Sequence, residues 1–107
     1  MSIFRKTISD CRTEQNPRKI VDTLRTHQAA INQEFTLEGE LKDAIQKYYN
    51  LLKTTTDYAV TVVNEGTNRH TDWRQKLDAY LDDLESLTVK IERLITEIYG
   101  KTHNFLK

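Results

Sequence analysis

The C-terminal third of the chain carries apolar residues at alternating steps of four and three. This spacing follows one face of an α-helix for about seven turns. It predicts a helix over 72–99 that packs lengthwise against other helices, as in a coiled coil. A loop over 64–72 precedes it, with Gly66 suited to a left-handed helix end. The apolar row consists of Trp73, Leu77, Tyr80, Leu84, Leu87, Ile91, Leu94 and Ile98.

The same period predicts two earlier helices. The first covers 17–36, because Asn16 is a good N-cap and Pro17 suits a first helical position, where its missing N–H costs nothing. The second covers 40–64. Its β-branched residues also favour a strand, but no second strand is available to pair with one. The core-facing rows are Ile20, Leu24, His27 and Ile31, then Leu41, Ile45, Tyr48, Leu52, Thr55, Ala59 and Val62.

The junction between these two helices has two interpretations. Thr36 suits an N-cap, and Gly39 weakens a helix interior by about 1 kcal/mol, so we predict a break or sharp bend at 36–39. The apolar row nevertheless continues in phase, which leaves one helix over 17–64 as the alternative. Such a helix would span about 70 Å at 1.5 Å per residue, whereas a compact domain of this size is about 26 Å across.

Residues 1–15 are predicted to form either a short helix or a mobile end, because Phe4, Ile8 and Cys11 share helical spacing. The whole chain is then a single domain, 1–107. Its predicted fold is an all-α antiparallel bundle of three long helices with a short fourth helix at the N-terminus.

Composition narrows the choice of function. The chain has 107 residues, 16 basic and 16 acidic, and the zero net charge removes the simplest argument for a nucleic-acid or anionic-membrane partner. The densest apolar run, 58–63, is too short to span a bilayer. The start of the chain lacks the apolar stretch of a signal peptide. We therefore expect a cytoplasmic protein without membrane association.

No set of residues predicts catalysis, a cofactor or a metal. His27, His70 and His103 lack the Glu-x-x-His and H-E-x-x-H patterns of metal sites. Cys11 is the only cysteine, so no disulfide within the chain is possible. It lies between Asp10 and Arg12 and has no His near it in sequence, so a thiol nucleophile is not indicated. The acidic run around Asp82 is typical of a solvated helix face. We expect a protein that is not an enzyme.

Large amphipathic side chains supply the positive argument for function. Tyr48 and Tyr80 fall on the core rows, whereas Tyr58 and Tyr99 lie off them and are candidate exposed anchors for a partner. Phe105 continues the last row, seven residues after Ile98. The last helix is predicted to span about 40 Å and to be longer than its predecessors, so that its end projects where a second copy covers it. We therefore predict a homodimer.

The leading hypothesis is a non-enzymatic protein–protein interaction module, such as a small adaptor, assembly factor or inhibitor, that presents a helical surface. The alternative is a nucleic-acid-binding bundle, because the N-terminal quarter has an excess of positive charge. Its candidate phosphate-binding residues are Arg5, Lys6, Arg12, Arg18, Lys19 and Arg25.

Overall fold

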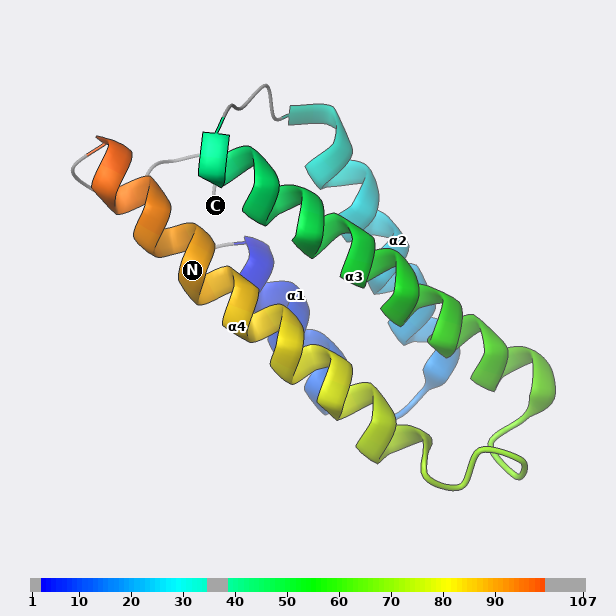
Figure 1. The fold of residues 1–107 in the computed structure, drawn as a ribbon. Coiled ribbons are helices and arrows are strands. Elements are labelled where there is room, and N and C mark those ends of the chain that lie inside the picture. Colours follow the sequence, from blue (N-terminus) through cyan, green and yellow to red (C-terminus); the bar gives the residue numbers. More distant parts are fainter. Residues whose placement is uncertain (1–2, 35–38, 100–107) are drawn as a thin grey trace.

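Four α-helices form an up-and-down bundle, shown in Figure 1. The computed structural model describes residues 3–34 and 39–99. α1 packs against α2 and α4, and α3 packs against the same two helices. This arrangement confirms the all-α antiparallel bundle with a short N-terminal helix. The bounds are Ile3–Thr13 for α1, Pro17–Glu34 for α2, Gly39–Glu65 for α3 and Trp73–Tyr99 for α4.

The long-helix alternative for 17–64 is wrong. α2 and α3 are separate helices that pack side by side in opposite directions (Figure 1). The break lies where it was predicted, although Thr36 itself falls outside the described residues. Gly39 opens α3 with a φ of 69°, which is in the left-handed region that glycine adopts without strain.

The helix ends follow the sequence signals. Asn16 caps α2, since its side-chain oxygen accepts a hydrogen bond from the Arg18 N–H at 3.0 Å. Gly66 ends α3 with a φ of 91°, and its N–H donates to the Val62 carbonyl at 2.8 Å. Asp72 directly precedes α4, and its carboxylate lies 3.6 Å from Lys76 Nζ in the first turn of that helix.

The predicted core rows of α2 and α3 are confirmed. Tyr48 is fully enclosed, and the buried His27 lies on the α2 row between Leu24 and Ile31. Every member of the α3 row is buried, together with Ala44 and Thr56. The face between these helices is therefore continuous from one end of the bundle to the other.

The predicted row of α4 is confirmed at Leu77, Leu84, Ile91 and Leu94, and its other members that the structure describes are only partly buried. Tyr80 and Leu87 are only half-buried, whereas their neighbours Leu81 and Thr88 are buried. The reason is that α4 packs against both α1 and α3, so its buried stripe is wider than a coiled-coil seam. The buried residues of α4 are Leu77, Leu81, Leu84, Thr88, Ile91, Leu94 and Ile95.

The last helix is not the longest. α3 and α4 have 27 residues each, so α4 does not exceed its predecessor. It does run past the start of α1, which has 11 residues (Figure 1).

α1 is docked by apolar burial and by charge. Phe4 and Cys11 are fully buried. Arg12 donates hydrogen bonds to Asp82 and Glu85 on α4, at 2.8 and 3.0 Å. At the C-terminal end of α1, the guanidinium of Arg74 on α4 donates hydrogen bonds to the carbonyls of Cys11 and Glu14, each at 2.7 Å. Carbonyls at the end of a helix lack the intrahelical donors of the interior, so Arg74 supplies donors at and just past the end of α1.

Replacing Phe4 with Ala should lower the free energy of unfolding by about 3–5 kcal/mol, because it empties a fully buried site. Denaturant unfolding measures this loss. Alkylation of the buried Cys11 thiol under native conditions should also become faster, since α1 then opens more often. Ser9→Ala, at an exposed position of the same helix, is the control. Wild-type alkylation as fast as in denaturant would contradict the docking of α1.

Candidate functional site

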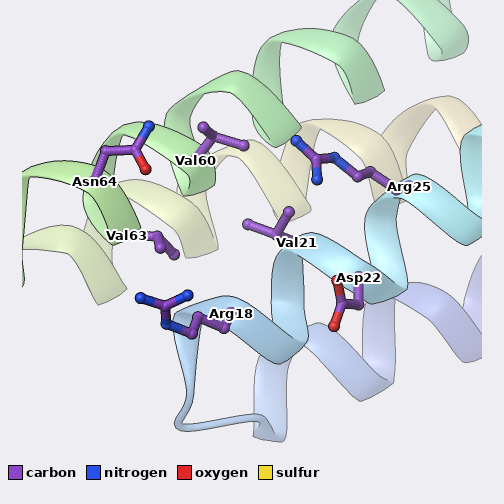
Figure 2. A pocket seen from close by; sticks show the side chains of 7 residues that line it. All are labelled: Arg18, Val21, Asp22, Arg25, Val60, Val63 and Asn64. Carbon is purple, nitrogen blue, oxygen red and sulfur yellow. The ribbon is translucent and has the colours of Figure 1, made fainter.

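A groove runs along the surface of the bundle between α2 and α3 and has a volume of about 320 Å³. Figure 2 shows the Arg18 guanidinium extending towards Val63 and the Arg25 guanidinium towards Val60, with Val21 between them. The groove thus has an apolar floor and a positive charge at each end. Its lining residues are Arg18, Val21, Asp22, Arg25, Val60, Val63 and Asn64.

Helical spacing assembles this lining. Arg18, Val21 and Arg25 follow one another at steps of three and four, which places them on one face of α2. On α3, Val60 and Val63 are half-buried beside the core row. Val21 is 6% exposed and borders the core. The floor of the groove is therefore the outer edge of the packed α2–α3 face.

A second hollow extends the groove towards the start of α2 and the end of α3. It has a volume of about 160 Å³ and shares Arg18 and Val63 with the first. Pro17, Gly66 and Thr67 also line it. Together the two hollows form an elongated surface along the helix pair rather than a single round pocket.

The two arginines of the groove carry charges that are not neutralised by an ion pair among the described residues. Within residues 3–34 and 39–99, neither Arg18 nor Arg25 forms an ion pair, and both are exposed. Asp22 is exposed too, but it also lines a cleft between α1 and α2. Its charge therefore lies on the α1 side of the groove, and the α3 side is positive.

The six basic residues predicted to bind nucleic acid divide into two groups. On α1, Arg5 donates hydrogen bonds to Glu92, and Arg12 donates hydrogen bonds to two acids of α4. The Nζ of Lys6 lies 3.5 Å from a carboxylate oxygen of Asp10. These pairs hold the pKa of the Arg5 and Arg12 guanidinium groups above their usual value, chiefly through the hydrogen bonds to Glu92 and to Asp82. The second group is on α2: Arg18 and Arg25 in the groove, and Lys19 exposed beside it.

The tyrosine expected to be an exposed anchor is half-buried. Tyr58 packs against Tyr80 and His70, with ring centroids 5.7 and 6.2 Å apart. Its hydroxyl is buried and has no hydrogen-bond partner in the described part of the chain, and burial raises its pKa. Of the other two predicted anchors, the side chain of Tyr99 and the whole of Phe105 lie outside the described residues.

His27 and Cys11 are buried in the core, whereas His70 lies near the surface with its Nε2 2.9 Å from a Glu65 carboxylate oxygen. His27 Nε2 lies 2.8 Å from the Tyr48 hydroxyl, and burial lowers the His27 pKa to about 4. Burial, aided by Asp10 and opposed by Arg74, raises the pKa of the Cys11 thiol to about 12. At neutral pH, His27 is therefore uncharged and Cys11 is a thiol. No three His, Cys, Asp or Glu side chains in the described ranges are grouped to hold a metal.

Sequence reasoning missed the groove as a site, although it singled out both arginines. It assigned no functional role to Val21, Val60 or Val63. A signal was present in the spacing Arg-x-x-Val-x-x-x-Arg from residue 18 to residue 25, which puts two cations around an apolar residue on one helix face. The contribution of α3 carries no such signal, because it depends on how the two helices align.

Comparison with known proteins finds no match, so any functional argument rests on the geometry of the groove. No protein-family model, curated protein or solved structure matches the chain. Among the four helices, over the residues described, none is long and apolar enough to cross a membrane.

Lowering the pH from 7 to 4 should reduce the free energy of unfolding by about 3 kcal/mol through His27 alone. The unfolded chain takes up a proton near pH 6.5, whereas folded His27 does so only near pH 4. Stability is therefore full above pH 6.5 and falls as the pH drops through this window. Chemical denaturation at several pH values measures the slope. His27→Gln, which cannot titrate, should remove that part of it; an unchanged slope in this variant would contradict the assignment.

Proposed function

We propose that the protein is a non-enzymatic protein–protein interaction module, such as a small adaptor, assembly factor or inhibitor, that presents the α2–α3 groove to its partner. One observation carries the proposal: Arg18 and Arg25 are exposed without ion pairs in the described structure and flank a floor of valines. Arginine is enriched at binding hot spots because its planar fork of donors pairs with carboxylates, and apolar groups beside it add burial.

A second candidate function is nucleic-acid binding through α2. Arg18, Lys19 and Arg25 are exposed on one helix, and clustered cations are the usual footprint for phosphates. The original candidate surface is weakened, because Arg5 and Arg12 already pair with acids of α4. Three cations give a small footprint, so a protein partner is favoured.

We further propose a homodimer in the cytoplasm. The dimer would form at the end of α4, where Tyr99 terminates the helix, with Phe105 in the segment that follows.

Affinity recovery of the tagged full-length protein from its native host should yield a stoichiometric protein partner. The double variant Arg18→Ala/Arg25→Ala should lose that partner, because both charges of the groove are removed. Lys42→Ala/Lys47→Ala changes the net charge equally, at exposed positions of α3 that are about 20 Å or more from Val60 along the helix. This control should retain the partner.

Quantitative mass spectrometry of the bound fraction separates the two candidates. Retention of the same partner by the Arg18/Arg25 variant would contradict the groove as the binding site. Recovery of nucleic acid that is released by raised salt would instead support the second function, since phosphate contacts weaken steeply with ionic strength.

Light scattering tests the homodimer. We expect a dimer mass at high concentration and a shift towards the monomer for Tyr99→Ser/Phe105→Ser, which removes two large apolar groups. A monomer mass for the wild-type chain at every concentration would exclude the dimer.

A further inference from the structure

The geometry points to an acidic amphipathic α-helix as the occupant of the α2–α3 groove. We infer that the partner helix carries two carboxylates seven residues apart, with an apolar residue three or four positions after the first. This inference rests on the proposed function, and it adds the chemistry and conformation of the segment that is bound.

The spacing of the two arginines carries the inference. Arg18 and Arg25 are seven residues apart on α2, which is nearly two turns or about 10.5 Å along the helix axis. Their guanidinium groups both extend towards α3, on either side of Val21 (Figure 2). Two anionic groups at a matching separation, on one face of a ligand, would contact both arginines at once.

A helix meets this requirement, and an extended strand does not. In any helix, residues i and i+7 are about 10.5 Å apart along the axis and share a face. A helix that packs in the groove in the class typical of helical bundles crosses its neighbours at about 20°, which keeps these two residues close to the line that joins the arginines. In a strand, three residues cover about 10 Å, but the side chains at i and i+3 point to opposite faces. The strand would then place only one carboxylate on the arginines.

The floor and length of the groove agree with a helical occupant. Val21, Val60 and Val63 lie between the two charges, where an apolar residue at i+3 or i+4 of the partner would be seated. The second hollow continues past Arg18 to Pro17 and Thr67, along the helix pair. An elongated ligand uses both hollows, whereas a compact one uses a single hollow.

Charge also sets the side of α2 on which the partner lies. Asp22 faces the cleft between α1 and α2, which Lys6 and Asp10 also line. An acidic helix is repelled by Asp22 and attracted by Arg18 and Arg25. It therefore lies towards α3 rather than across α1, and this is the side on which the valines are accessible.

Binding of two designed peptides to the full-length protein tests the inference. Both are about 18 residues long with side-chain bridges that keep them helical, since short peptides are only marginally helical in water. One carries Glu at i and i+7 with Leu at i+3. The other has the same composition, with the second Glu moved to i+5, where it lies on another face. Fluorescence anisotropy should show at least tenfold tighter binding of the first.

Exchange of charges is the matched control. R18E/R25E should no longer bind the acidic peptide and should instead bind a peptide that has Lys in place of Glu at i and i+7. K42E/K47E should bind the acidic peptide as the wild type does. In the nuclear magnetic resonance spectrum of labelled protein, the acidic peptide should shift the amide signals of Val21, Val60 and Val63. Equal binding of the two acidic peptides, or shifts confined to other helices, would overturn the inference.

The outcomes separate this inference from the function on which it rests. If the native partner depends on Arg18 and Arg25 but neither helical peptide binds, the acidic helix is excluded while the interaction module stands. If a short single-stranded DNA displaces the peptide at equal concentration, the groove is a phosphate site and the inference fails. If the partner ignores both arginines, the proposed function fails whatever the peptides do.

Discussion

The contact of Phe4, His27 and Tyr48 is the constraint on which the arrangement of α1, α2 and α3 depends. The ring of Phe4 lies edge-on to both others, with centroids 5.4 Å from His27 and 4.7 Å from Tyr48. A buried hydrogen bond of 2.8 Å between His27 and Tyr48 joins α2 to α3. Leaving either polar group unpaired in the core would cost about 1–3 kcal/mol. The bond therefore fixes the register of α2 on α3, and with it the position of the groove arginines opposite the valines of α3.

α1 is attached to this centre by two kinds of interaction with different roles. Burial of Phe4, Ile8 and Cys11 supplies the stability, because exposed ion pairs contribute only about 0–1 kcal/mol each. The pairs of Arg5 and Arg12 with α4 set the alignment of the two helices instead. As a consequence, the basic residues of α1 are paired within the molecule, whereas Arg18 and Arg25 of α2 form no ion pair among the described residues. That division makes α2 rather than the whole basic N-terminal quarter the candidate surface.

Individual residues show which parts of the core the sequence predicts and which it does not. The core rows of α2 and α3 were predictable because the apolar residues of each helix fall mainly on one row, which a simple period identifies. In α4 the same reasoning placed Tyr80 and Leu87 inside, whereas Leu81 and Thr88 are the buried residues. The apolar residues of α4 occupy two adjoining rows, and their spacing alone does not show that both rows contribute to the buried stripe. Thr88 was also overlooked because it is polar, although its hydroxyl is satisfied by the Leu84 carbonyl at 2.9 Å.

The sequence by itself determined the helices, their ends at Asn16 and Gly66, and the antiparallel order, because these depend on spacing and on local hydrogen bonding. Only the tertiary structure decided which cations are paired and where a groove forms. Arg12 and Arg18 look alike in sequence, but one meets acids 70 residues or more away on α4 and the other meets valines of α3. Charge pairing and surface shape depend on the relative placement of whole helices, and local sequence pattern does not contain that placement.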